Sequence, residues 1–149
     1  MQGDEKRNSM KIINTIKSPK KFNIEELLNF LAEKLNISED VELTVAYNDR
    51  LLNMLSKDIE YSALLQKILP KKYILFISSD VDGLQYILCH EMIHLSQYER
   101  GDLEISSDFK QVTWKGNKYN NSVEYKDREW EEEAFSLQNK LWKEFKKEK

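Results

Sequence analysis

The sequence is poor in cysteine, proline and glycine, and it has no long apolar run. Its one cysteine, Cys89, excludes an internal disulfide and fits a reducing compartment. No segment approaches the ~20 consecutive apolar residues that a membrane helix needs. Residues 1–10 also lack the apolar segment of a secretory signal. We therefore expect a cytoplasmic protein that does not associate with membranes.

The chain also has no excess of positive charge. Its 149 residues include 23 Lys and Arg against 26 Asp and Glu, which gives a formal net charge of −3. A broad basic surface for nucleic acid is therefore not expected. The sequence shows no internal repeat and no linker rich in Gly, Ser or Pro, and its length fits one compact domain. We predict a flexible N-terminal tail over residues 1–10 and a single domain over residues 11–149.

Apolar periodicity predicts both strands and helices, and hence an α+β fold. Alternating or continuous runs of β-branched and other apolar residues predict strands at 11–16, 41–47 and 72–78. Helical spacing of leucines predicts a helix over 24–35, with Asn23 as its N-cap. The segment 51–69 is predicted as one or two helices that end at Pro70.

The second half of the chain predicts two further helices and a hairpin. One helix should begin near Asp80 or Val81, with Ser79 or Asp80 as its cap, and end at Gly101. Strand-like residues on both sides of the turn at 115–117 predict a hairpin or extended loop. The last helix should begin at about Asp127, and its apolar stripe consists of Trp130, Ala134, Leu137, Leu141 and Phe145.

Both histidines of the chain lie in the segment CHEMIHL, residues 89–95. On a helix, His90 and His94 are one turn apart, so both imidazoles project from one face and can bind one Zn²⁺. Glu91 is rotated by ~100° from His90, which lets its carboxylate reach a zinc-bound water without occupying the metal. Zinc lowers the pKa of such a water towards ~7, and Glu91 would then act as the general base. The motif H-E-x-x-H therefore indicates a zinc-dependent hydrolase.

A zinc site of this kind needs a third protein ligand, and the sequence limits where it can come from. The extended motif with glycine at 97 and histidine at 100 is excluded, because Gln97 and Arg100 occupy these positions. Cys89 should point away from the metal-binding face, so we predict a small packed side chain there. The remaining candidates are carboxylates: Asp102, Asp108 and the glutamates of REWEEEAFSLQ at 128–138.

Helix geometry separates the glutamates of this last segment. At ~100° per residue, Glu131 lies closer to the apolar stripe of the helix than Glu133 does. Glu132 falls almost opposite the stripe and should be solvated. The geometry therefore favours Glu131 and leaves Glu133 as the alternative.

The order of the two motifs resembles that of a known family. H-E-x-x-H on one helix, followed by E-x-x-A on a later helix, is similar to the gluzincins and specifically to small zincin domains of the ImmA/IrrE type. Glu131 and Ala134 of WEEEAF match the second motif. Residues 72–140 also resemble short HExxH proteins of bacteria and their phages. The resemblance implies a minimal zincin-like fold, in which a short sheet packs on the helix of His90 and His94 and a C-terminal helix supplies Glu131.

Together these features predict a zinc metallopeptidase. His90, His94 and Glu131 would hold Zn²⁺, and Glu91 would serve as general base in the hydrolysis of a peptide or protein substrate. The alternative is a zinc-bearing binding or scaffold domain without hydrolytic activity, and a metal-free helical interaction module is a third possibility. The glutamate at 91 favours the peptidase, because a purely structural zinc site needs no carboxylate at that position. Three tyrosines near the site could donate a hydrogen bond to a developing oxyanion, but we do not rank this role above packing: Tyr98, Tyr119 and Tyr125. The tryptophans are expected in the core or at a subunit contact rather than as a substrate platform: Trp114, Trp130 and Trp142.

Overall fold

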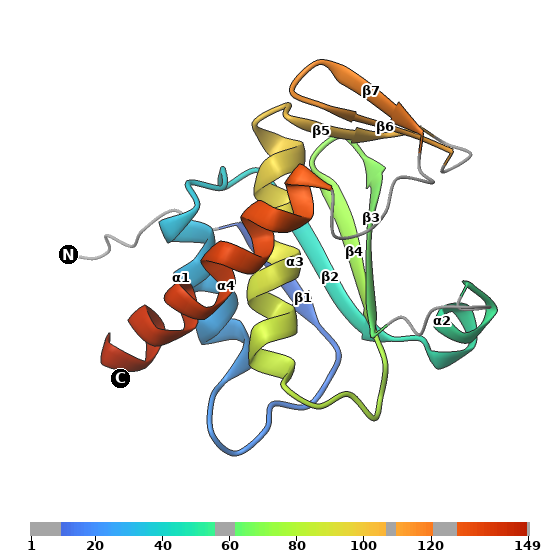
Figure 1. The fold of residues 1–149 in the computed structure, drawn as a ribbon. Coiled ribbons are helices and arrows are strands. Elements are labelled where there is room, and N and C mark those ends of the chain that lie inside the picture. The colour runs from blue at the N-terminus through green and yellow to red at the C-terminus, as the bar shows by residue number, and fades with distance from the viewer. Residues whose placement is uncertain (1–9, 56–61, 107–109, 121–127, 149) are drawn as a thin grey trace. The chain divides into compact units, whose positions relative to one another are not determined.

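The computed structural model describes residues 10–55, 62–106, 110–120 and 128–148 (Figure 1). The chain divides into two compact units, residues 1–82 and 83–149. Each unit combines helices with a small β-sheet, so the predicted α+β class is confirmed. The single domain over 11–149 stays a prediction, and residues 1–9 of the predicted tail lie outside the described residues.

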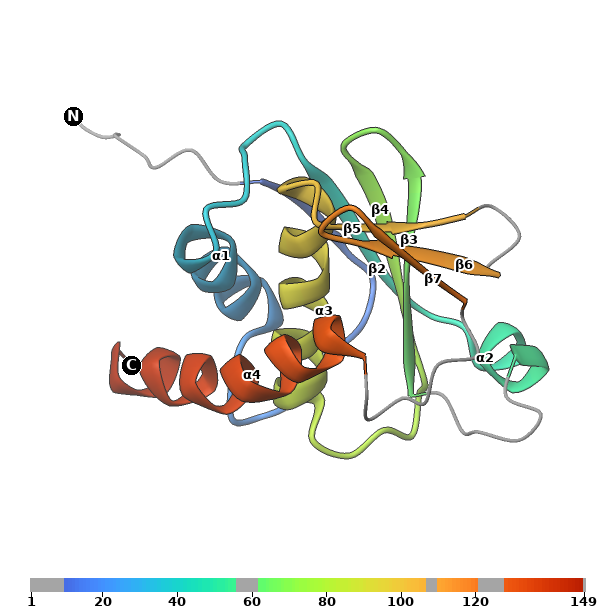
Figure 2. The ribbon, with the colours of Figure 1, turned by 45° about the horizontal axis from the view of Figure 1, so that its top comes forward.

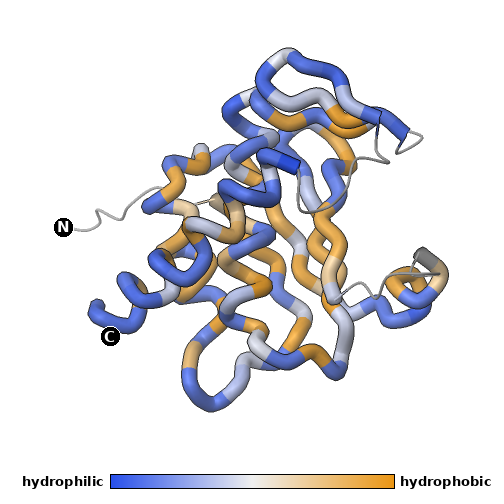
Figure 3. Tube along the Cα trace, in the orientation of Figure 1, coloured by the Kyte–Doolittle hydropathy of each residue, from blue (hydrophilic) through white to orange (hydrophobic). Residues whose placement is uncertain are grey.

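The first unit contains a four-stranded sheet with the strand order β1-β2-β4-β3. Its first three strands in this order are parallel, whereas β3 pairs antiparallel with β4 and forms an edge. The strands are β1 (Lys11–Asn14), β2 (Glu42–Tyr47), β3 (Ala63–Leu69) and β4 (Lys72–Ile77). Buried side chains alternate along β2 and β4, so one face of these strands supplies core residues. Figure 3 shows apolar stretches along these strands.

Helix α1 (Ile24–Lys34) confirms the predicted helix and its cap. The side chain of Asn23 accepts a hydrogen bond from the backbone N–H of Glu26 at 3.0 Å, which satisfies one of the free donors of the first turn. Leu27, Leu28 and Leu31 are fully buried, as their helical spacing predicts. Local sequence signals were therefore sufficient for this element.

The predicted helices over 51–69 are only partly correct. Residues 49–55 form α2 (Asp49–Leu55), but Ala63–Leu69 is strand β3. This segment pairs with β4 through a tight turn in which Lys71 has a φ of 70°, and Leu65 lies opposite Leu75. Its leucine-rich composition favours a helix, but pairing with an adjacent buried strand overrides that preference.

The second unit consists of two helices and a three-stranded antiparallel sheet. Helices α3 (Leu84–Glu99) and α4 (Glu129–Glu148) contact each other and lie side by side in both ribbon views (Figure 1 and Figure 2). The strands are β5 (Leu103–Ile105), β6 (Gln111–Trp114) and β7 (Asn117–Asn120). The predicted hairpin is confirmed, and its two turn residues, Lys115 and Gly116, have φ values of 50° and 84°.

Helix α3 begins later than the sequence predicts. Its N-cap is Gly83, with a φ of 68°, and the expected caps Ser79 and Asp80 lie outside the helix. Ser79 is held elsewhere, because its backbone N–H and its hydroxyl donate to the carboxylate of Asp49 at 2.9 and 2.6 Å. The predicted end at Gly101 is confirmed: this residue has a φ of 80°, and its N–H donates to the carbonyl of Tyr98.

Helix α4 has a buried stripe and a hydrophilic end. The buried residues agree with the predicted stripe except that Leu137 is half-buried and Trp142 is added: Trp130, Ala134, Leu141, Trp142 and Phe145. Leu103, Val112, Trp114 and Trp130 form one buried cluster, against which Tyr98 and Tyr119 pack. The last turn of α4 is hydrophilic (Figure 3). In the described part of the chain, none of the helices has the length and apolar character needed to cross a membrane.

Candidate metal centre

Helix α3 presents the two histidines on one face. His90 and His94 are both buried, and their ring centroids are 4.7 Å apart. Their Nε2 atoms are separated by 3.2 Å. The four-residue spacing thus brings two imidazole nitrogens to one point, as the motif predicts.

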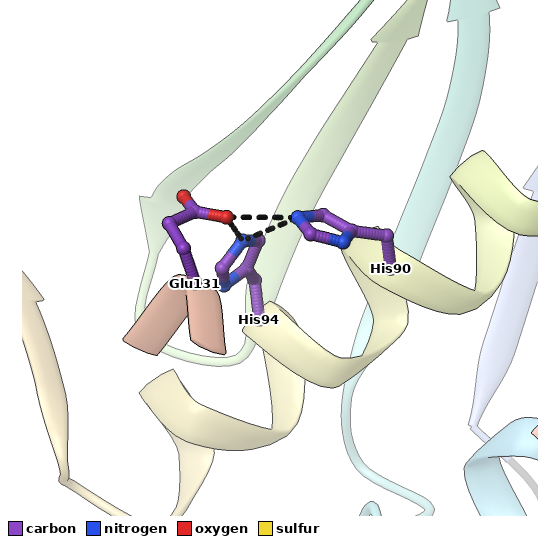
Figure 4. Close-up of side chains that lie close together, drawn as sticks. All are labelled: His90, His94 and Glu131. Carbon is purple, nitrogen blue, oxygen red and sulfur yellow. Dashed lines mark hydrogen bonds and ion pairs between the residues drawn. The ribbon is translucent and has the colours of Figure 1, made fainter. Parts of the chain in front are cut away.

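Helix α4 supplies the third side chain of the cluster. Glu131 Oε1 lies 2.9 Å from His90 Nε2 and 3.1 Å from His94 Nε2. Figure 4 shows the three side chains pointing toward one another. Within the described residues, these three form the one group of His, Cys, Asp or Glu side chains whose ligand atoms lie close enough together to hold a metal ion.

The protonation of His94 follows from the contacts of Gln97. The side-chain nitrogen of Gln97 donates to the carbonyl of Trp130 at 3.0 Å and to Glu133 Oε1 at 2.8 Å. Because both of these partners are acceptors, the amide nitrogen must face them and the amide oxygen must face His94. That oxygen lies 2.8 Å from His94 Nδ1. Neutral His94 therefore carries its proton on Nδ1 and directs the lone pair of Nε2 towards Glu131.

His90 has a matching partner on α4. Its Nδ1 lies 2.7 Å from the side-chain oxygen of Gln138, so the proton of neutral His90 also belongs on Nδ1. When both histidines are neutral, two imidazole lone pairs and a carboxylate oxygen converge, and none of the three atoms has a hydrogen to donate. Such a convergence is unfavourable unless a cation occupies it.

The distances within the cluster fit a zinc ion. Around a tetrahedral Zn²⁺ with bonds of ~2.0–2.1 Å, ligand atoms are separated by about 3.3 Å. The three separations in the structure are 3.2, 2.9 and 3.1 Å. Two imidazoles and one carboxylate are also a donor set that zinc takes in catalytic sites, with one position left open.

The electrostatics of the cluster favour positive charge. Burial by itself would lower the pKa of His94, but the hydrogen bond to Glu131 and the neighbouring carboxylates raise this pKa to about 9. Burial by itself would raise the pKa of Glu131, but the hydrogen bonds with His90 and His94 hold this pKa well below its usual range. The metal-free cluster is thus stabilised by a bound proton, which a metal ion would displace.

Glu91 lies beside the cluster and is not part of it. It is half-buried on α3, and its carboxylate is not among the converging ligand atoms. Burial raises the pKa of Glu91, and positive charge on His94 and His90 opposes this shift. The side chain is therefore near enough to interact with the cluster, as a general base in the H-E-x-x-H motif would have to be.

The other candidate ligands have different positions. Asp102 accepts a hydrogen bond from Arg100 Nε at 2.7 Å, and Glu133 accepts from Arg100 and Gln97. Asp108 lies outside the described residues, as does Tyr125. Cys89 is fully buried, and burial raises the pKa of its thiol to about 12. Among the described candidates, the structure brings only Glu131 to the histidines.

Three residues around the histidines were not predicted from the sequence. They are Gln97, Gln138 and Phe135, whose ring centroid lies 4.6 Å from that of His90. A partial signal exists, because Gln97 is three residues after His94 and Gln138 is seven residues after Glu131, so each shares a helix face with a predicted ligand. Glutamine is common on solvated helix faces, however, and only the packing of α3 on α4 distinguishes these two.

Comparison of this chain with protein-family models, with curated proteins and with solved structures finds no match. The assignment of a metal centre is therefore supported by the chain's own motif and geometry. The two observations are independent, because the spacing of His90 and His94 is local whereas their contact with Glu131 joins residues 37 and 41 positions apart.

Proposed function

We propose that this protein is a zinc-dependent peptidase, in which His90, His94 and Glu131 hold the metal and Glu91 is the general base. The observation that carries the proposal is the convergence of two histidine Nε2 atoms and one carboxylate oxygen within 3.2 Å of one another. The H-E-x-x-H motif supplies two of these ligands, and E-x-x-A supplies the third, in the order found in gluzincins.

Each residue of the cluster has a distinct part in this proposal. The two imidazoles bind through Nε2, because Gln138 and Gln97 hold their Nδ1 protons. Glu131 adds the negative charge that offsets part of the charge of the metal. When bound, zinc would polarise the substrate carbonyl and acidify a water molecule at the open position.

Glu91 would transfer protons during hydrolysis. It directly follows His90 on α3, so its side chain projects to the flank of the cluster and leaves the metal to the other three residues. A carboxylate there can accept a proton from the attacking water and donate it to the leaving amine. A purely structural metal site has no use for such a group, which is why we favour a peptidase over a scaffold domain.

The first experiment is metal analysis of the full chain purified without added metal. The proposal expects about one zinc per chain. The same donor set suits iron(II) in other enzymes, so elemental analysis should measure both metals. Metal content far below one per chain, together with no rise in melting temperature on addition of zinc, would rule out the metal centre.

The second experiment compares wild type with Glu91→Gln on a mixed library of quenched fluorescent peptides. The variant should keep its zinc and lose a factor of ~10²–10⁴ in turnover, as expected for a positioned acid–base group. Glu104→Gln, an exposed change in β5, is the matched control and should retain full activity. If wild type binds zinc but cleaves no peptide, the non-catalytic scaffold replaces the peptidase. If Glu91→Gln cleaves at the wild-type rate, Glu91 is not the base.

A further inference from the structure

Gln97 is the most deeply buried polar side chain near the candidate centre. It lies on α3 three residues after His94, and its exposed fraction is 0%. A buried amide must have partners for both its oxygen and its nitrogen, and Gln97 has three. They are His94 Nδ1, the carbonyl of Trp130 and Glu133 Oε1.

The partners of Gln97 lie on both sides of the candidate ligands. Its oxygen binds the ring of His94 on α3, and its nitrogen binds α4 at positions 130 and 133. These two positions lie on either side of Glu131 near the beginning of α4. One side chain thus joins the ring of one ligand to the backbone turn that carries another.

We propose that Gln97 is a positioning residue that aligns two zinc ligands at once. It holds the His94 ring with Nε2 directed at the metal, and it sets the position of the first turn of α4 so that Glu131 meets that nitrogen. This inference rests on the zinc centre proposed above and adds a residue to it. Because the ligand separations are only 2.9–3.2 Å, a shift of α4 by a fraction of a turn would remove Glu131 from bonding distance.

In the structure Glu133 is not a candidate ligand but accepts hydrogen bonds from two residues at the end of α3. Its Oε1 accepts from Gln97 at 2.8 Å and from Arg100 at 2.7 Å. Arg100 is the C-cap of α3, and its Nε donates to Asp102 at 2.7 Å. Glu133 therefore fastens the beginning of α4 to the end of α3. This explains why the neighbouring glutamates at 131 and 133 have different functions in the structure.

His90 provides an internal comparison. Gln138 Oε1 contacts His90 Nδ1 but lies two turns further along α4, away from the turn of Glu131. A change at Gln138 should therefore disturb one ligand, whereas a change at Gln97 should disturb two. The effect on zinc affinity should be larger at Gln97.

The test measures zinc affinity of the full chain by competition with a chromophoric chelator. Gln97→Met preserves length but has neither a strong donor nor a strong acceptor, and it should weaken zinc binding by 10–100-fold or more, as changes to residues that orient metal ligands do. Glu133→Ala should weaken binding within the same range. Glu133→Gln should recover most of the affinity, because its amide oxygen can still accept from Gln97 and Arg100. Glu132→Ala, an exposed neighbour, is the control and should match wild type.

A spectroscopic measurement distinguishes alignment from general stability. In zinc-loaded wild type, ¹⁵N-resolved NMR of the histidine rings should show a slowly exchanging Nδ1–H on His94. Gln97→Met should make this proton exchange faster while the Nδ1–H of His90 stays as in wild type. A merely structural effect would change both rings alike.

The inference is overturned if folded Gln97→Met binds zinc within threefold of wild type, or if Glu133→Ala and Glu133→Gln behave alike. The Glu133 pair decides the matter even if Gln97→Met fails to fold. The peptidase activity is tested separately. If zinc affinities change as expected but no peptide is cleaved, the positioning role is supported and the peptidase activity is rejected. If peptides are cleaved but the zinc affinities of the variants equal that of wild type, the peptidase activity is supported and the positioning role is rejected.

Discussion

Replacing Glu131 with alanine should remove one of three converging ligand atoms and leave the two histidine nitrogens 3.2 Å apart. Changes to residues that only orient ligands typically weaken metal binding 10–100-fold, so the loss of a ligand should weaken it by more than about 100-fold. This corresponds to at least ~2.8 kcal/mol of binding free energy. The change lies at the edge of the buried stripe of α4, so the helix itself should persist.

The expected thermal shift follows from these values. At free zinc 100-fold above its dissociation constant, wild type should gain ~2.7 kcal/mol of unfolding free energy. A variant with 100-fold weaker affinity should gain only about 0.4 kcal/mol at the same zinc concentration. For a chain of about 150 residues, each kcal/mol shifts the melting temperature by ~2–4 °C. The zinc-induced rise should therefore be about 5–11 °C in wild type and about 1–2 °C in Glu131→Ala.

The assay is differential scanning calorimetry of each protein with chelator and with buffered free zinc. Subtracting the two melting temperatures of the same variant removes any effect of the substitution on the metal-free protein. Glu132→Ala, whose side chain is exposed on the same helix, should show the full wild-type rise. A wild-type rise in Glu131→Ala would refute Glu131 as a ligand and would direct attention to Asp108, which the described residues do not include.

Three further predictions concern the fold of the chain. Asn23→Ala removes the cap of α1 and should cost ~0.5–2 kcal/mol of unfolding free energy, measured by urea titration, whereas an unchanged midpoint would show that the bond to Glu26 contributes nothing. Gly101→Ala should lower the free energy of unfolding by ~1–2 kcal/mol, because Gly101 has a positive φ that alanine adopts poorly. An added Cβ meets no atom within 4 Å, so no steric clash contributes, and Gly101→Asn should lower the free energy of unfolding by less. Cys89 is buried and the pKa of its thiol is raised to about 12, so it should not react with a thiol reagent at pH 8 in the native protein and should react after denaturation. Rapid labelling of the native protein would contradict this prediction.

Local patterns in the sequence determined the elements whose signals involve near neighbours. Asn23 and the leucines of α1 specify a helix through contacts within one or two turns. The pair Lys115–Gly116 specifies a hairpin through its own backbone conformation. The spacing of His90 and His94 places two imidazoles on one helix face, because the helical period alone decides this.

Tertiary structure decided the features that depend on distant partners. The leucine-rich segment of β3 is extended because β4 offers an adjacent strand, which no local preference records. Ser79 does not cap α3, because Asp49, thirty residues earlier, already binds its hydroxyl and its amide. In both segments a hydrogen-bonding partner outside the segment prevails over a local signal that is worth about 2 kcal/mol or less.

The candidate centre combines both kinds of information. The sequence by itself identified the two histidines, the neighbouring Glu91 and a short run of glutamates on a later helix. Helix geometry favoured Glu131, but only the packing of α3 against α4 brought Glu131 Oε1 to both imidazoles and turned Glu133 towards Gln97. Glu131 and Glu133 are alike in chemistry and only two positions apart, so a difference of about 200° around the helix axis separates a candidate ligand from a residue that supports the ligands.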